Sequence, residues 1–388
     1  MTTTSSERPS SERASEERQG RIGFPGSSHS VDWLLITSAL AISALGLAMV
    51  YSAARGRLGS SVATGIVSRQ AVWMGAGVVL MLSVCRLRRR GLKLLAAGCY
   101  LGTVLALVAV LSPLGSAVNG SSAWFHLGPV SLQPSEPAKV GLVLVLAGYC
   151  ARHEARLDAW RFTVALVVAG VPLCLVLAQP DFGTAVVIAV ATLAVLVVGG
   201  ARLGHVALVA LAAGSLFAGV LYEGMLRPYQ VERLAGFLEP GRDPYGSTYH
   251  IEQSAIAIGS GGLAGQGFLR GPQTRLAYVP EQHTDFIFSA VGEELGLAGA
   301  ATLLGLFALL LWRVWEAARR STDLFGSVAC IGVFAMICFQ VFQSAGMAMG
   351  ILPVTGVPLP LVSYGGSSTL ATFLGLGVVA SVSRRASF

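Results

Sequence analysis

The sequence predicts an all-α, polytopic integral membrane protein with about ten transmembrane helices and a large extracytoplasmic loop between helices seven and eight. Of its 388 residues, 54% are hydrophobic and only 12% are charged, whereas soluble domains carry about 25% charged residues. Residues 33–53 contain no charge, and this run is long enough to cross a hydrocarbon core of roughly 30 Å. The apolar runs also lack the strict alternation of β-barrel strands, which excludes that class.

The chain divides into a tail and one membrane domain. Residues 1–30 are rich in Ser, Glu and Arg and contain no apolar run, so they predict a disordered cytoplasmic tail and not a signal peptide. Residues 31–385 are expected to form a single ten-helix domain. The spans are predicted at 33–53, 70–85, 92–112, 133–150, 161–178, 182–200, 203–222, 284–312, 324–345 and 366–383.

Cysteines and net charge exclude other classes. The six cysteines include no CxxC pair, so neither a disulfide scaffold nor a zinc site is indicated. The net charge of +7 comes from basic residues scattered among short loops, and this pattern does not suggest a nucleic-acid partner.

The placement of Lys and Arg predicts the orientation. If the amino terminus is cytoplasmic, 18 of the 27 basic residues lie on the cytoplasmic side, eight lie outside, and Lys139 lies within a span. Because basic residues accumulate in cytoplasmic loops, both termini are expected in the cytoplasm.

This orientation places four segments with unusual sequences together on the outer face. These segments are 113–132, 179–183, 223–283 and 346–365. The 223–283 loop is unusually long and too apolar and aromatic for disorder, so we expect it to fold back on the membrane surface. The working face of the protein is therefore predicted here.

Two outer motifs carry charge beside the spans. In SLQPSEPAK, Ser135 is a possible helix N-cap, and Glu136 and Lys139 share a helix face three residues apart. They are either a self-neutralising ion pair or the lining of a polar cavity. In AQPDFGTA, Asp181 directs its carboxylate to the same side, although a tight turn needs such residues anyway.

Two glycine-rich motifs are less specific. Residues 255–265 contain a G-x-G-x-x-A match, but no βαβ unit fits in the loop, so a dinucleotide site is rejected. Residues 350–368 place three prolines and four glycines at membrane depth. Non-helical backbone there needs protein or water around it, which fits a kinked connector and a cavity wall equally.

The segment PEQHTDF, residues 280–286, offers the richest chemistry. Thr284 or His283 could cap the eighth helix, with Asp285 in its first turn. Capping needs only one small polar residue, however, and this run carries five polar side chains. Glu293 and Glu294 lie two turns deeper, and at least one of them must face protein.

In this order the motifs resemble the SEDS family (shape, elongation, division and sporulation) from Asp32 to about Arg384. The matching segments are DWLL, VYSA, RQAVW, NGSSAWFHLGPVSLQPSEPAK, QPDFGTA, YQVERLAGFLEP, DPYGSTYHIEQSAIAIGSGGLAGQG, PEQHTDFIFSAVGEELG and GILPVTGVPLPLVSYGGSS. YHIEQS, GPQT and PEQHTDFIFS are more similar to the elongation branch of the family, and MVYSA and GARL to the division branch. The elongation branch is favoured.

The resemblance implies a peptidoglycan glycosyltransferase that polymerises lipid II at the outer face of the bacterial cytoplasmic membrane. It implies a class B penicillin-binding transpeptidase as partner, together with other membrane proteins of the elongation complex. By the same resemblance Asp285 is the catalytic residue. The resemblance also places Glu136, Lys139 and Arg233 in the substrate site. The further predicted substrate-binding residues are Asp181, His283, Gln253 and Ser363.

Two positions depart from the family pattern. Ala123 stands where the family usually has Arg or Lys, so a phosphate contact from that loop is in doubt. Ser344 stands where the family usually has Asn, which affects a hydrogen bond between packed helices.

The chemistry of this reaction fits the outer residues. It needs a base near a sugar hydroxyl and positive charge at the departing pyrophosphate. A divalent cation, Mg²⁺ or Mn²⁺, is plausible with pyrophosphate, although no metal motif and no organic cofactor is indicated. The alternatives are a lipid II flippase, a division-type septal polymerase and a non-catalytic scaffold. A flippase needs polar contacts through both leaflets, whereas the ionisable residues here gather in the outer half.

Overall fold

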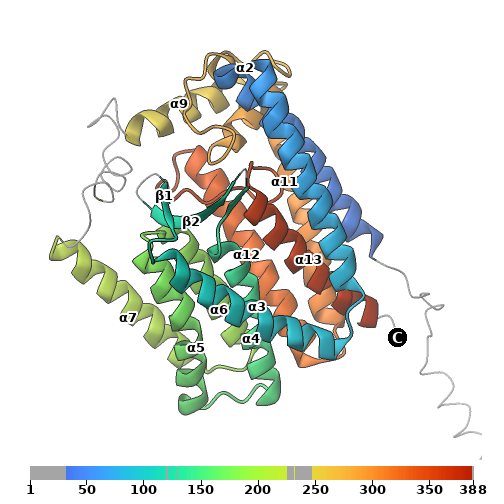
Figure 1. Cartoon of the computed structure of the whole chain (residues 1–388), viewed down its shortest axis with the longest axis vertical. Coiled ribbons are helices and arrows are strands. Elements are labelled where there is room, and N and C mark those ends of the chain that lie inside the picture. The colour runs from blue at the N-terminus through green and yellow to red at the C-terminus, as the bar shows by residue number, and fades with distance from the viewer. Residues whose placement is uncertain (1–31, 119–120, 129, 225–230, 232–246, 387–388) are drawn as a thin grey trace, which may run out of the picture.

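The protein is a bundle of helices with one small sheet (Figure 1). The computed structural model describes residues 32–118, 121–128, 130–224, 231 and 247–386. The tail expected at 1–30 and the proposed site residue Arg233 lie outside this part. The helices are α2 (Trp33–Cys85), α3 (Arg89–Val110), α4 (Ser135–Arg152), α5 (Ala159–Ala178), α6 (Phe182–Val198), α7 (Leu203–Tyr222), α9 (Ser247–Ser260), α10 (Pro272–Arg275), α11 (Ile287–Arg320), α12 (Leu324–Ala348) and α13 (Gly366–Ala386).

The predicted polytopic membrane class is confirmed. Within the described ranges, seven helices are long and apolar enough to cross a membrane: α2, α3, α5, α7, α11, α12 and α13. Of the other two predicted spans, α6 is apolar but has only 17 residues, and α4 includes Glu136, Lys139 and Arg152. All ten predicted spans overlap helices, because α2 contains two of them.

The loop predicted between the first two spans is wrong. α2 runs through 54–69 and departs from helical geometry at Gly59, where φ is 82° and ψ is 165°. Glycine tolerates positive φ because it has no Cβ, and no proline in this segment ends the helix. The two arms of α2 meet at the top of Figure 1.

The segment 113–132, which is predicted to lie outside, contains strands that the helical pattern did not predict. β1 (Ser116–Val118), β2 (Ser121–Leu127) and β3 (Val130–Leu132) form an antiparallel sheet in the order β1-β2-β3. In its second hairpin, His126 lies opposite Ser131. Helices α9 and α10 lie within the long loop before α11, where α9 packs on α11 and α10 packs on α2; that the loop folds back on the membrane surface stays a prediction.

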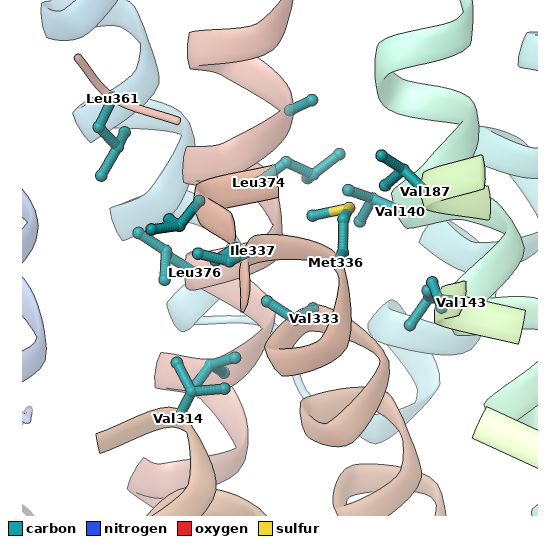
Figure 2. Close-up of a cluster of buried hydrophobic side chains, with 14 of the residues drawn as sticks. Val140, Val143, Val187, Val314, Val333, Met336, Ile337, Leu361, Leu374 and Leu376 are labelled. Atoms are coloured by element: carbon teal, nitrogen blue, oxygen red, sulfur yellow. The ribbon is translucent and has the colours of Figure 1, made fainter. Parts of the chain in front are cut away.

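The core lies around α12, which packs on α4, α6, α11 and α13. Figure 2 shows Met336 and Val333 of α12 among side chains from these helices. The approach to α4 is close because Gly332 has no side chain: a Cβ there would lie 2.3 Å from a methyl carbon of Val143. This packing fixes the helices whose ends carry the candidate site.

Candidate active site

The 351–365 segment connects α12 to α13 and contains neither helix nor strand. Two glycines let helices approach it closely. A Cβ at Gly46 of α2 would lie 2.5 Å from the Cα of Val362, and one at Gly183 of α6 would lie 2.6 Å from the carbonyl oxygen of Thr355. Protein therefore surrounds this non-helical backbone, as membrane depth requires. The segment thus contacts the turn that carries Asp285 and the start of α6, next to Asp181.

Gln70 of α2 holds the carboxyl end of the 351–365 segment. Its side chain is fully buried. The Nε2 atom donates to Thr369 Oγ1 at 3.0 Å and to the Ser363 carbonyl at 3.4 Å, and Oε1 accepts from the Gly365 amide at 3.2 Å. A buried amide that satisfies several backbone groups fixes their positions, because leaving any of them unpaired costs free energy.

Asp285 lies in a run of turns, residues 281–285, beside the 351–365 segment. Its amide donates to the Glu281 carbonyl at 3.0 Å, and the Tyr364 amide donates to the His283 carbonyl at 3.0 Å. A Cβ at Gly356, where φ is 70°, would lie 3.5 Å from Asp285 Oδ2. The Asp285 side chain is partly exposed, and its carboxylate lies next to backbone that carries no side chain.

The helix-capping interpretation of this turn is wrong. α11 begins at Ile287 and not at 284; its N-cap is Phe286, without a side-chain cap hydrogen bond. Thr284 Oγ1 donates instead to the Glu281 carbonyl at 3.0 Å. Glu281 has a positive φ of 49°, so the chain turns back here and the helix starts later. Asp285 consequently lies outside the first turn of α11.

His283 is partly buried on the same turn. Burial lowers the pKa of its imidazole, the Glu281 carboxylate opposes this shift, and the Arg57 guanidinium adds to it. Glu281 and Arg57 form an ion pair of 3.1 Å, with each side chain nearly half exposed. The imidazole ring lies 6.0 Å from the Tyr364 ring, centroid to centroid.

The two deeper glutamates face protein, as predicted. Glu293 is fully buried and accepts from the Gln273 amide, the Thr274 amide and Thr274 Oγ1 at 2.6, 2.9 and 2.6 Å. Glu294, only 1% exposed, accepts from Ser52 Oγ. Gln282 Nε2 donates to Thr274 Oγ1 at 3.0 Å, so the Glu293 network reaches the turn that carries Asp285.

The second charged group lies at the start of α4. Lys139 Nζ and Glu136 Oε1 are 2.8 Å apart, and both residues are only 2% exposed. The expected cap is wrong, because Pro134 occupies the N-cap position and makes no side-chain cap bond. The Oγ atom of Ser135 is buried without a partner among the described residues. The cost of burying both charges opposes their Coulomb attraction, so burial alone does not show that the pair is there for stability. The geometry therefore fits both a self-neutralising ion pair and the lining of a polar cavity.

Asp181 joins this group from the start of α6. It caps the helix by accepting from the Thr184 amide at 3.0 Å, and its other oxygen accepts from Gln133 Nε2 at 3.1 Å. Burial raises the pKa of Asp181, against the opposing effects of the Thr184 bonds and of Lys139. The Gln133 amide in turn donates to Ser367 Oγ of α13 at 2.9 Å.

The other predicted substrate-binding residues are placed differently. Ser363 is 4% exposed, and its Oγ accepts from the Leu359 amide at 2.9 Å, so this hydroxyl already shapes the 351–365 segment. Gln253 lies half-buried on α9, next to Ser254, which donates to the Ala348 carbonyl at 2.6 Å. These contacts leave the two assignments untested.

The two departures from the family pattern are both buried. Ala123 is 1% exposed in β2 and brings no charge to the loop. Ser344 is fully buried in α12, and its Oγ has no hydrogen-bond partner within the described part of the chain.

A cavity of about 520 Å³ opens beside the Asp285 turn. The sequence pattern did not single out most of its lining, although Arg69 and Trp73 lie in RQAVW and Trp124 and His126 in the motif before α4. These residues become neighbours only when α2, the sheet and the 351–365 segment meet. The lining residues are Ser68, Arg69, Val72, Trp73, Trp124, His126, Ser131, Thr284, Tyr364, Gly365 and Gly366.

The donor set does not fit a metal site built by protein alone. Over the residues that the structure describes, no three His, Cys, Asp or Glu side chains lie close enough together to hold an ion.

Comparisons with known proteins identify the class. The model of the cell cycle protein family that covers FtsW, RodA and SpoVE matches residues 32–387. The chain belongs to this family, which confirms the SEDS resemblance. The peptidoglycan glycosyltransferase MrdB of Escherichia coli K12 is 41% identical over 337 residues, covering 86% of this chain and 90% of that protein. A probable peptidoglycan glycosyltransferase FtsW of Alkalilimnicola ehrlichii is 38% identical over 367 residues, covering 91% and 89%.

Solved structures agree with these sequence relatives. A chain of a peptidoglycan synthase complex that coordinates polymerisation and crosslinking is 36% identical with a TM-score of 0.78, covering 92% of this chain and 98% of that one. The rod shape determining protein RodA of Thermus thermophilus is 34% identical with a TM-score of 0.68, covering 92% and 97%.

Proposed function

We propose that this chain polymerises lipid II into glycan strands and that Asp285 is the catalytic base. Its family and its relatives make it a peptidoglycan glycosyltransferase. The observation that carries the assignment is the turn at 281–285, which holds a partly exposed carboxylate next to a cavity and against the bare backbone of Gly356.

The reaction joins two lipid-linked sugars. A hydroxyl oxygen of the acceptor sugar attacks the anomeric carbon of the donor, and the bond from that carbon to the lipid pyrophosphate breaks. The pyrophosphate leaves with the bonding electron pair, and the hydroxyl proton passes to a carboxylate oxygen of Asp285. A base within hydrogen-bond reach of the hydroxyl is required for this transfer, and a fixed turn positions it better than a free loop.

The remaining site residues have supporting roles in the proposal. Lys139 places positive charge near the reaction, and Glu136 orients its ammonium group through the ion pair at 2.8 Å. Asp181 and His283 are proposed to contact substrate sugars, with Gln253, Ser363 and Arg233 as further contacts. A group of charges built in advance stabilises charge that develops in the transition state.

A divalent cation enters the proposal only as a companion of the substrate pyrophosphate. Mg²⁺ binds phosphate oxygens together with one or two carboxylates and several waters, and this does not require a protein cluster of three ligands. If polymerisation needs the ion, removal of Mg²⁺ and Mn²⁺ with a chelator stops it and re-addition restores it.

The working face is proposed to be extracytoplasmic and both termini cytoplasmic. The asymmetry of basic residues supports this orientation, and in Figure 1 the C-terminus lies away from α9 and the kink of α2. A cysteine placed at exposed Leu263 should react with an impermeant reagent from outside the cell, and one at exposed Arg90 should not. The opposite labelling pattern would contradict the orientation.

The partner is proposed to be a class B penicillin-binding transpeptidase within an elongation complex. The similarity to a chain of a complex that coordinates polymerisation and crosslinking supports a crosslinking partner. The identity of 41% with MrdB against 38% with an FtsW supports elongation over division.

One assay tests the reaction and its flippase alternative. Purified protein with its partner, lipid II and Mg²⁺ in detergent is expected to yield glycan polymer on a gel. Asp285→Asn keeps the side-chain shape but cannot take the proton, so we expect a well-expressed, partner-bound protein that makes no polymer. Polymer formed by Asp285→Asn would overturn the base assignment. A wild-type protein that makes none, yet moves labelled lipid II across vesicles, would favour a flippase.

A further inference from the structure

The cavity beside the Asp285 turn has an uneven chemistry. Its eleven lining residues, all within the described ranges, include a guanidinium, an imidazole and three aromatic rings other than imidazole, but no Asp or Glu. Such a cavity favours an anionic ligand, since no carboxylate repels it. The aromatic rings offer flat apolar faces with polar edges, which suit the apolar face of a sugar.

Arg69 is the cation of this cavity and is available to a ligand. It is exposed, and among the described residues no carboxylate forms an ion pair with it, in contrast to Arg57, which pairs with Glu281 at 3.1 Å. Its place on α2 is fixed by its neighbour Gln70, which bonds to Thr369 at 3.0 Å. A guanidinium held in this way can make two parallel hydrogen bonds to one phosphate group.

The opposite side of the cavity is also held in place. His126 Nδ1 and Ser131 Oγ are 3.0 Å apart across the β2–β3 hairpin. Trp73 packs against Gly366, where a Cβ would lie 2.6 Å from the indole ring. Trp124 of β2 therefore lines a cavity whose other side chains are held in place by contacts within the protein.

We propose that this cavity binds the sugar-pyrophosphate part of a lipid-linked substrate, with Arg69 on the phosphates and Trp124 against a sugar ring. The inference rests on the proposed function and assigns a subsite to it. Thr284 lines the cavity and immediately precedes Asp285, so a bound pyrophosphate lies close to the reacting carboxylate. The positive charge that the reaction needs at its phosphates then comes in part from α2.

A binding measurement in the inactive Asp285→Asn protein tests this subsite without turnover. The probes are dansyl-labelled lipid II and undecaprenyl pyrophosphate in mixed micelles. Arg69→Gln is expected to weaken both by about tenfold or more, because a charged hydrogen bond to phosphate is lost. Trp124→Leu is expected to weaken lipid II alone by several-fold, because the lipid pyrophosphate carries no sugar. Arg55→Gln removes the same charge from an exposed α2 position outside the cavity and is expected to change neither affinity by more than about twofold.

The donor and the acceptor both carry a lipid pyrophosphate, so a third probe is needed to tell their binding sites apart. This probe is a lipid-linked tetrasaccharide, which stands for the growing strand that acts as donor, whereas lipid II stands for the acceptor. A larger effect of Arg69→Gln on the tetrasaccharide assigns the cavity to the donor, and a larger effect on lipid II assigns it to the acceptor; both outcomes support the subsite. Unchanged affinity for every probe in a folded Arg69→Gln protein would overturn it. Because binding is measured apart from polymerisation, binding through Arg69 in a chain that makes no polymer would refute the reaction and leave the subsite standing.

Discussion

Asp285 and Glu293 are eight residues apart, at the two ends of one short stretch, yet the protein treats their carboxylates differently. Glu293 is fully buried and takes three hydrogen bonds from Gln273 and Thr274. Asp285 is partly exposed on a turn next to a cavity. A carboxylate enclosed by donors holds elements together, whereas one that stays partly exposed can exchange a proton with a ligand.

The largest expected effect on stability separates these two roles. Glu293→Ala leaves buried donors without an acceptor, and we expect it to lower the free energy of unfolding by about 3 kcal/mol or more. Asp285→Ala should lower it by less than Glu293→Ala does, since the Asp285 side chain is only partly buried. Size-exclusion profiles after graded heating in detergent measure both. Equal losses in the two variants would remove the distinction.

A charge exchange in the buried pair sharpens the comparison, because Glu136 and Lys139 are as enclosed as Glu293 but are proposed to serve the reaction. Glu136→Lys combined with Lys139→Glu keeps the net charge, so we expect a stability loss of about 1–2 kcal/mol with near-normal expression. Polymerisation should be abolished, because the positive charge no longer lies at its place in the site.

The control is the same exchange in the Glu316–Arg320 pair, whose Arg320 side chain is 68% exposed. We expect this variant to retain its activity, because the pair lies at the C-terminal end of α11, apart from the proposed site residues; the Glu316 side chain is only 14% exposed, so some loss of stability is expected. Polymer made at the wild-type rate after the Glu136–Lys139 exchange would return that pair to a structural role.

The smallest expected effect concerns His283, on the Asp285 side of the comparison. Burial lowers the pKa of its imidazole in the folded state, so the unfolded chain binds the proton more readily. Stability from this group is therefore complete above the unfolded pKa of about 6.5 and is lost as pH falls through the folded pKa.

His283→Gln should remove that part of the pH dependence, a change in Tm on the order of 1 °C between about pH 7.5 and pH 5.5. Melting curves of the wild type and the variant across this range measure the difference. Identical pH profiles would show that His283 titrates alike in the folded and unfolded states.

Composition and periodicity were sufficient for the membrane class and for a helix at each of the ten predicted spans. They failed where a single residue decides geometry. Gly59 turns α2 without a loop, and the positive φ of Glu281 delays the start of α11. Periodic patterns average over many residues and do not contain this information.

The cavity was missed for a different reason. Arg69, Trp124 and Tyr364 lie on segments far apart in the sequence and meet only through tertiary packing. The Gln70 contacts that hold these segments together depend on atom positions, and a single sequence does not give them. The family motifs nevertheless contain Arg69, Gln70, Trp124 and Tyr364. The cavity could have been predicted only by assuming that these motifs lie next to one another in space.

Helix α7 suggests how the enzyme responds to the lipids around it. All of its described side chains are at least partly exposed, and α6 is its principal neighbour. Among the described residues, other helices therefore cover little of its surface, and a helix of 20 residues is about 30 Å long. In a thinner or thicker bilayer, α7 can change its tilt at little cost, while Asp285 keeps the neighbours that fix it. The protein thus has a part that adapts to membrane thickness and a reaction centre that does not need to.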